Sequence, residues 1–561
     1  MKRLTILLVA MAAAFALHAQ GVTDTVKNKA SRDAGTVLSF ISSEGRYDWT
    51  DSGNWYAGLN PVNRIPLSND EVIITGKCNF PVFWSTIDGE QIEEPVSITI
   101  EDGAQVHIPQ GMEVWATVKK SIEPYELHVD DGVVPNGWYL ISIPVRPQGG
   151  TYQAAQNQPD DPSAGSYCSY EEAGFFRSGD YDFYIYDQDE KLYDQDQDGN
   201  PDPTGEGEWR NRKAYFNEGV EYYFVADYNG YLYANSKTTT LSFYGPLYNK
   251  GTYSEDYPYG QKIYSNLYYN ADADDGAKGV NLIGNPYACN ALVQGENIES
   301  FYKMNDDRND VVVIDPNNDM VIAPMTALFA VVNEQNENTS VTFSPIDFSN
   351  TQANIRGNGV EGLKIELTAN GVLQDRVYMK AGEGVNARKF SMSKLAPKIY
   401  VTENGKKYAI AYKEDANVMP LCFTTAKDDL FTLNFDTKGF NGSYLHLIDN
   451  ATGADIDLLS TPSYTFNSKD CGYASRFKIV FNEEATNEID DNFAFISNGE
   501  LVINGTGTVQ IFDIVGRNLY TQELQTLNSQ LSTLNSQLKK GVYVVRLCNG
   551  NDVKTQKIVV R

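Results

Sequence analysis

Short runs in which apolar and polar residues alternate, separated by glycine-containing turns, recur along this chain of 561 residues. Examples are VSITI at residues 96–100, QVHI at 105–108 and LHLI at 445–448. A period of two gives a β-strand one buried face, whereas an amphipathic helix repeats about every 3.6 residues. Because the mature chain shows no sustained helical period, the pattern predicts an all-β protein with almost no helix.

The length suggests about four domains at ~150 residues each. Lysine and arginine total 45, aspartate and glutamate total 74, and the formal net charge is −29. A surface this acidic repels nucleic acid and anionic lipid, so we expect neither as a direct partner. No segment after the N-terminal region has about eighteen apolar residues in succession, so we expect no transmembrane segment.

The N-terminus has the features of a secretory signal peptide. A Lys-Arg pair precedes an apolar run at residues 4–17, and Ala19 follows shortly after. A basic start, an apolar run too short to span a bilayer and a small residue before the break are typical of such signals. We expect residues 1–19 to be removed and residues 20–36 to form a flexible lead.

Turn clusters and strand spacing divide the remaining chain into four units. Residues 37–132 are expected to form a small β-solenoid or sandwich, because their strands are short and closely spaced. Residues 133–350 form an aromatic-rich β module and residues 351–483 a β-sandwich, since about eight strands follow at sandwich spacing. Residues 484–561 form a last, small β domain.

The second unit contains an internal repeat. GWYLISIP at residues 137–144 and GVNLIGNP at residues 279–286 share Gly, Leu, Ile and Pro at the same positions. We therefore expect two related strands that enter equivalent turns, as in a duplicated β unit.

The last unit carries VQIFDIVGR at residues 509–517, GVYVVRL at residues 541–547 and two lysines in its closing strand. In this order the motifs resemble the type A C-terminal sorting domain of the type IX secretion system, a small Ig-like β-sandwich. The sorting-motif residues that the resemblance implies are Gly516, Arg517, Gly541, Tyr543, Lys554 and Lys557.

The resemblance implies a destination for the protein. Export by the type IX secretion machinery would carry the chain through the periplasm to the outer surface of a Gram-negative bacterium, or release it. In this family the sorting domain is usually removed after translocation, which would place cleavage within residues 482–491. Many mature proteins of this kind are then joined to surface lipopolysaccharide.

One segment of the last unit departs from the family pattern. TLNSQLS at residues 526–532 is followed at once by TLNSQLK at residues 533–539. The leucine spacing is that of an amphipathic helix, but two heptads are too few for a stable coiled coil. The family usually crosses this region with an irregular or strand segment, so a tolerated surface insertion is the favoured interpretation.

One constellation in the sequence suggests metal chemistry. The segment DQDQDGNPD places Asp194, Asp196 and Asp198 at alternate positions, and Asn200 and Asp202 would add further oxygens. Alternate carboxylates followed by glycine can converge on Ca²⁺, and the segment is similar to calcium loops of thrombospondin type 3 repeats and dockerins. It lacks the closing glutamate of an EF-hand. The alternative is an acidic, solvated loop between aromatic strands.

No catalytic motif stands out. The mature chain has only His107, His128 and His446, in different regions, and it lacks the H-E-x-x-H, G-x-S-x-G, P-loop and Rossmann patterns. The favoured hypothesis is a non-enzymatic protein for adhesion or for binding extracellular glycan or matrix protein. The alternative is a secreted carbohydrate-active or other hydrolase with an unrecognised carboxylate pair, so the question of enzymatic activity stays open.

Overall fold

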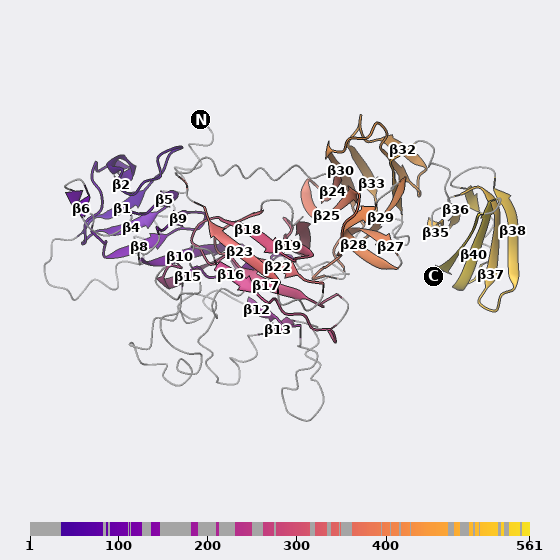
Figure 1. The fold of residues 1–561 in the computed structure, drawn as a ribbon, viewed down its shortest axis with the longest axis horizontal. Helices are drawn as coiled ribbons and strands as arrows, with labels where there is room; N and C mark the ends of the chain where they lie inside the picture. The colour runs from indigo at the N-terminus through magenta and orange to yellow at the C-terminus, as the bar shows by residue number, and fades with distance from the viewer. Residues whose placement is uncertain are drawn as a thin grey trace, which may run out of the picture.

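A computed structural model of the chain describes residues 35–125, 136–145, 181–188, 209–211, 230–248, 262–348, 362–482 and 493–560, with short gaps inside these ranges. The predicted signal peptide lies outside these residues. The described elements are β-strands apart from one 3-10 turn, η1 (Ser52–Asn54), so the all-β, multidomain prediction is confirmed. The modules follow one another from the N-terminal strands to the C-terminal domain (Figure 1). The domain boundaries stay predictions.

The N-terminal part is a small β-solenoid. Its rungs are short parallel strands: β1 (Val37–Phe40), β4 (Glu71–Ile74) and β8 (Ser97–Ile100), with a second pair β5 (Lys77–Asn79) and β9 (Gln105–His107). The rungs stack in register, so the buried residues Leu38, Val72 and Ile98 stand in one row. Side chains that stack in this way bury a continuous core although each strand has only three or four residues.

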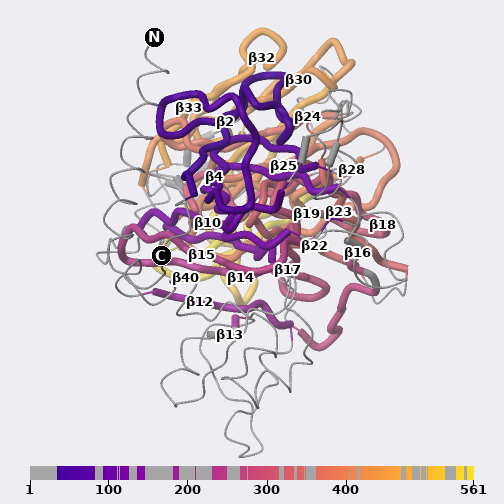
Figure 2. Tube along the Cα trace, turned by 90° about the vertical axis from the view of Figure 1, so that its left-hand side faces the viewer, coloured from indigo at the N-terminus to yellow at the C-terminus, as the bar shows by residue number. Residues whose placement is uncertain are grey.

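A longer antiparallel pair closes the solenoid sheet. β10 (Trp115–Ile122) pairs in parallel with β8 and, along its whole length, antiparallel with β15 (Thr239–Pro246). The sheet order is β15-β10-β8-β4-β1-β2 (Trp55–Ala57)-β3 (Asn60–Pro61), and β6 (Thr86–Ile87) and β7 (Glu90–Gln91) form a separate hairpin. Both views show β15 beside β10 (Figures 1 and 2), so the first two sequence units share one sheet.

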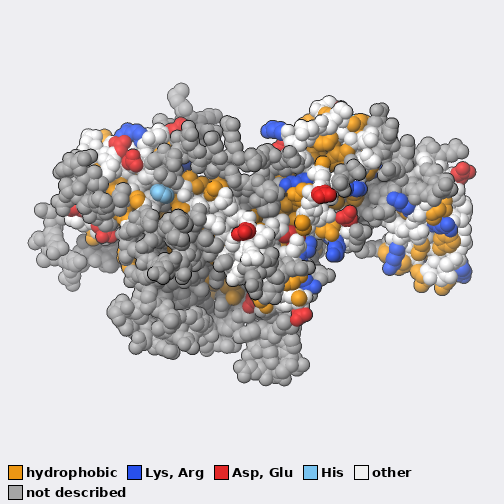
Figure 3. Space-filling model, viewed as in Figure 1, with side chains coloured by type: hydrophobic (Ala, Val, Ile, Leu, Met, Phe, Trp, Pro, Cys, Tyr) orange, Lys and Arg blue, Asp and Glu red, His pale blue; other side chains and the backbone are white. Residues whose placement is uncertain are grey.

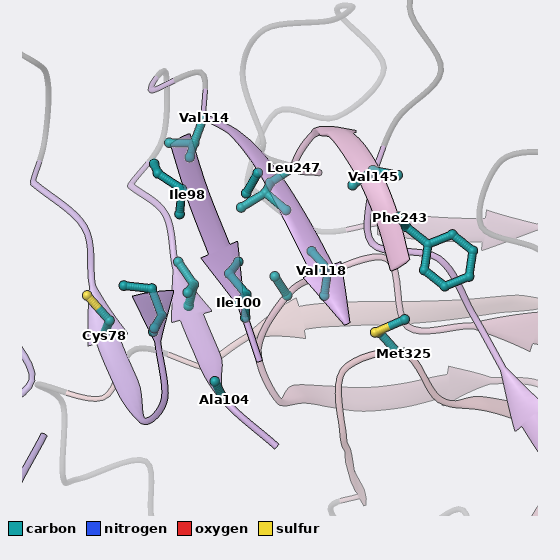
Figure 4. Close-up of a cluster of buried hydrophobic side chains, with 14 of the residues drawn as sticks. Cys78, Ile98, Ile100, Ala104, Val114, Val118, Val145, Phe243, Leu247 and Met325 are labelled. Atoms are coloured by element: carbon teal, nitrogen blue, oxygen red, sulfur yellow. The ribbon is translucent and has the colours of Figure 1, made fainter. Parts of the chain in front are cut away.

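The solenoid core continues into this pair. Ile98 and Ile100 of β8, Val118 of β10 and Phe243 of β15 lie in one buried cluster (Figure 4). Met325, from a later turn, belongs to the same cluster. The core therefore joins the solenoid to the module that follows it.

Two four-stranded sheets of the second module have the same strand order. They are β11 (Tyr139–Ile141)-β14 (Tyr231–Asn235)-β12 (Tyr181–Tyr186)-β13 (Trp209–Asn211) and β17 (Val280–Gly284)-β22 (Ala327–Val331)-β19 (Ser300–Met304)-β20 (Val311–Ile314). Each copy begins just after a glycine with positive φ, Gly137 at 87° and Gly279 at 71°. Such values favour glycine. The shared order agrees with the duplicated β unit inferred from the sequence repeat.

The sheets of these modules stack in layers. In β14, Tyr231 and Tyr233 pack in the solenoid core, while Leu232 between them packs in the core shared with the second copy. In β22, Phe329 packs in that shared core, and its neighbour Leu328 packs in a further core on the other face of the sheet. A fourth sheet covers this last core: β16 (Lys262–Ser265)-β23 (Ser340–Pro345)-β18 (Ala291–Glu296)-β21 (Met320–Ile322). Strands buried on both faces give large aromatic side chains such as Tyr233 and Phe329 an apolar environment.

The third module is one long sheet that folds over itself. Its order is β32 (Ala454–Asp457)-β31 (His446–Asp449)-β34 (Phe477–Val480)-β29 (Val418–Thr424)-β27 (Lys398–Glu403)-β28 (Lys406–Lys413)-β25 (Val372–Ala381)-β24 (Gly362–Ala369)-β30 (Leu430–Gly439)-β33 (Ser463–Asn467), and β26 (Ala387–Arg388) pairs with β28. Phe466 of β33 meets Phe477 of β34 with ring centroids 4.8 Å apart, so opposite ends of the sheet enclose one core.

A polar junction joins the second and third modules. The hydroxyl of the fully buried Tyr302 donates to the Arg388 carbonyl at 2.6 Å and accepts from the Phe390 amide at 3.1 Å. Arg388 also pairs with Glu299, whose side chain is fully buried. Burial of the phenol raises the pKa of Tyr302. Buried polar groups need partners, and these contacts supply them across the junction.

The C-terminal domain packs a three-stranded sheet against a four-stranded sheet. The strands are β35 (Ala494–Ser497)-β36 (Glu500–Ile503)-β39 (Ser529–Leu531) and β38 (Asn518–Leu524)-β37 (Gly507–Asp513)-β40 (Gly541–Asn549)-β41 (Asp552–Val560). β39 belongs to the duplicated segment and pairs with β36. The helix that the leucine spacing suggested is therefore wrong for these three residues. The edge of β36 offers this segment backbone hydrogen-bond partners between strands, which an isolated two-heptad helix lacks.

Candidate functional site: the C-terminal domain

The two faces of the four-stranded sheet differ in character. Val509 and Ile511 of β37 and Val545 and Leu547 of β40 are fully buried against the other sheet. Alternate residues on the same strands point to the opposite, outer face. A partner can reach that outer face.

A tight turn joins β37 to β38 and contains two of the predicted sorting-motif residues. Gly516 has φ +83°, which favours glycine, and its amide donates to the Asp513 carbonyl at 3.0 Å. The Arg517 amide and guanidinium donate to the two carboxylate oxygens of Asp513 at 2.9 and 2.6 Å. Desolvation opposes these bonds, but together they lower the pKa of Asp513. The turn is therefore held in one shape.

The other predicted motif residues lie on β40 and β41. Tyr543 is buried, and its hydroxyl donates to the Lys539 carbonyl at 2.7 Å, which anchors the chain just before Gly541. Lys557 pairs with Val544 and lies on the outer face, whereas Lys554 pairs with the inward residue Leu547. The fold thus brings Arg517, Tyr543 and Lys557 toward one end of the sheet, while Lys554 lies nearer the other.

The domain also exposes apolar residues that its sequence motifs do not indicate. Ile514 and Val515 in the turn are 75% and 71% exposed, and Val559 of β41 is 53% exposed. Hydrophobic side chains gather on the visible side of the domain and are bordered by Lys and Arg (Figure 3). The available signal was the Ile-Val pair at the centre of a turn, a place where polar residues are usual.

The predicted calcium ligands, Asp194 to Asp202, lie outside the described residues. Within the described part of the chain, no group of three or more His, Cys, Asp or Glu side chains is placed to hold a metal ion. His446 of β31 is bonded through Nδ1 to Asp455 at 2.6 Å and stacks on Tyr444. These contacts give it a structural role.

The deeply buried carboxylates of the third module, Asp375 and Asp449, each pair with a cation. Asp375 binds Lys389 Nζ at 2.5 and 2.6 Å, and burial raises the pKa of Asp375 although Lys389 opposes the shift. Asp449 receives two hydrogen bonds from Arg476, each 2.9 Å long. Both carboxylates are shielded from solvent and occupied by these contacts.

Comparison with known proteins identifies the domain. Residues 489–561 match the family model of the secretion system C-terminal sorting domain, so the chain carries a type IX sorting domain at its C-terminus, as predicted. No curated protein matches the chain. Among solved structures it is similar to a biofilm associated protein (BSP domain), with 11% identity and a TM-score of 0.11. That match covers 48% of this chain and 59% of the other, so the chain spans about three fifths of that protein.

The sorting domain implies export to the cell surface or the medium by the type IX machinery. No helix among the described residues has the length and apolar character needed to cross a bilayer.

Proposed function

We propose that this protein is a non-enzymatic surface protein, exported by type IX secretion, that acts in adhesion by binding extracellular glycan or matrix protein. The observation that carries the proposal is the sorting domain at residues 489–561. The formal net charge of −29 agrees with the proposal, because a strongly charged surface keeps an extracellular protein soluble. Anchoring to surface lipopolysaccharide after removal of the sorting domain is part of the proposal.

Export is tested by deleting residues 489–561 in the bacterium that carries the protein. The truncated chain should remain in the periplasm, whereas the full chain should become accessible to protease added outside the cell. A truncated chain that still reaches the surface would overturn the export proposal. Mass spectrometry should show that the mature surface form lacks Arg561. A surface form that retains Arg561 would argue against cleavage and lipopolysaccharide anchoring.

Binding is supported by an aromatic pair on the outer face of the solenoid sheet. Trp115 of β10 and Tyr244 of β15 lie with ring centroids 5.7 Å apart, and Tyr244 is 53% exposed. Aromatic rings on a shallow surface can stack on the apolar faces of sugar rings. Nearby on β10, Lys119 pairs with Glu101 at 2.8 Å, which adds donors and acceptors with little net charge. Such a surface suits a neutral glycan.

The binding test is a glycan and matrix-protein screen on the mature chain, with hydrolysis assays on the same glycans. A variant with Trp115→Ala and Tyr244→Ala should lose binding, whereas Tyr268→Ala removes a tyrosine that is 48% exposed elsewhere and should not. Equal binding by both variants would overturn the assignment of this surface. Turnover of a bound glycan would overturn the non-enzymatic proposal and favour the hydrolase alternative.

A further inference from the structure

We propose that an apolar strip on the outer face of the sorting domain is the surface that docks onto the type IX machinery. The strip consists of Phe512, Val542, Val544 and Val559, together with Ile514 and Val515 in the adjoining turn. This inference rests on the proposed export and adds which face of the domain is used and what kind of partner surface it fits.

Exposure is the first support. Ile514, Val515 and Val559 are 75%, 71% and 53% exposed, although all three belong to one small domain. Burying a side chain of this size is worth about 1.5–3 kcal/mol in general, so leaving three of them in water forgoes stability. Clustered apolar exposure on a folded domain is typical of an interaction site.

Contiguity is the second support. Phe512 of β37 stands opposite Val544 of β40, and Val542 stands opposite Val559 of β41. Directly opposed side chains on one sheet face lie about 4.5–5.5 Å apart at Cβ. Because Val542 and Val544 are two positions apart on one strand, they point to the same face and join the two pairs into one surface.

The strip is also held rigid. The Asp513–Arg517 contacts and the left-handed conformation of Gly516 fix the turn that carries Ile514 and Val515. Tyr543, on the buried side of β40 and opposite Asp513, anchors the same end of the sheet through Lys539. The motif residues therefore act as positioning residues that present the apolar side chains, and a rigid surface loses less entropy on binding.

Charge identifies the chemistry of the partner. Arg546 pairs with Gln510 and Lys557 with Val544, so both cations lie on the outer face beside the strip, and Arg517 lies in the turn. The matched range has seven Lys and Arg against six Asp and Glu, whereas the whole chain has 45 against 74. A partner with an apolar centre and an acidic rim is attracted to this domain and repelled by the cargo. A second copy of the domain would bring two basic rims together and is disfavoured.

The test uses the full-length chain in its own bacterium. In the double variant Ile514→Ser with Val559→Ser, the fraction of the protein on the surface should fall at least about tenfold, and the protein should accumulate in the periplasm. The reason is that truncation of hot-spot residues in an interface lowers the binding affinity by this factor or more. The matched control is Val96→Ser with Leu430→Ser, which changes residues 65% and 54% exposed in other modules and should export normally. Hydrogen exchange of β37 and β40 should be unchanged in the strip variant, which separates docking from folding.

Charge reversal gives an independent arm. Arg546→Glu with Lys557→Glu should also reduce export, whereas Lys406→Glu in the third module should not. If the strip variants export normally while deletion of residues 489–561 abolishes export, the docking face is wrong and the export proposal stands. If the deletion also exports normally, the export proposal itself fails. If the purified wild type dimerises and the strip variants abolish dimerisation but not export, the strip is a self-association surface and the proposal is overturned.

Discussion

The buried pair Asp449–Arg476 provides a sharp test of what holds the third module together. Arg476 donates from Nε and Nη2 to the two oxygens of Asp449, each at 2.9 Å, and the side chains are 7% and 0% exposed. Tyr464 adds a hydroxyl to the same carboxylate at 2.9 Å. Asp449→Asn keeps the shape but leaves the guanidinium buried without its counter-charge. Breaking such a pair costs about 3–5 kcal/mol.

The assay is native-state hydrogen exchange of the full mature chain, because separate modules need not unfold together. Amides of β31 and β34 in Asp449→Asn should exchange roughly a hundredfold to several thousandfold faster than in wild type. The matched control is Asp51→Asn in the solenoid. Arg46 binds Asp51 with the same two-bond geometry, at 2.7 and 2.8 Å, but that pair is largely exposed. Exchange there should change no more than about fivefold.

A second variant tests whether a loss of protection from exchange comes from the uncompensated charge of Arg476 or from the lost contacts of Asp449. Adding Arg476→Met to Asp449→Asn removes the uncompensated cation and should recover part of the protection, since apolar replacements of a buried pair are often tolerated. A change of less than about tenfold in Asp449→Asn would refute the reasoning, because it would mean that the guanidinium keeps its solvation in the folded state. Equal effects at both pairs would refute it as well.

Three further predictions follow from local chemistry. Gly516→Ala should destabilise the β37–β38 hairpin by about 1–2 kcal/mol in hydrogen exchange, because φ is +83° although no atom lies within 4 Å of an added Cβ; an unchanged exchange rate would show that the turn relaxes. Burial raises the pKa of Asp70, but hydrogen bonds from Arg64 and from two backbone amides outweigh burial and lower it. The Asp70 carboxylate therefore contributes its full stabilisation to the folded state above about pH 4, and this contribution is lost as the pH falls through the lower folded-state pKa. The difference in urea midpoint between wild type and Asp70→Asn should therefore be constant from neutral pH to about pH 5 and shrink in stronger acid, and a difference that grows in acid would contradict this. We propose that calcium orders the acidic segment at residues 194–202, so millimolar calcium should raise the melting temperature and Asp196→Asn with Asp198→Asn should abolish the gain; equal wild-type melting in calcium and in chelator would remove the site.

The identity of the C-terminal domain could be predicted from the sequence because its motifs are local. A Gly-Arg turn and a Gly-x-Tyr strand start depend on residues that are neighbours in the chain, so they are visible without the fold. The apolar strip could not be found in this way. It joins Phe512, Val544 and Val559 from three strands, and their approach depends on the pairing register. A shift of one residue would turn these side chains into the core.

The sequence by itself determined the class of structure. Alternating apolar residues, as in VSITI, specify a strand and its buried face through nearest neighbours alone, and the prediction of an all-β chain rests on nothing more. The tertiary structure decided which strands meet. β15 joins the solenoid sheet from more than a hundred residues away. β39 forms an edge strand where the leucine spacing suggested a helix. The physical reason is that backbone hydrogen bonds in a sheet are made between strands, so a strand's own residues specify its faces but not its partner.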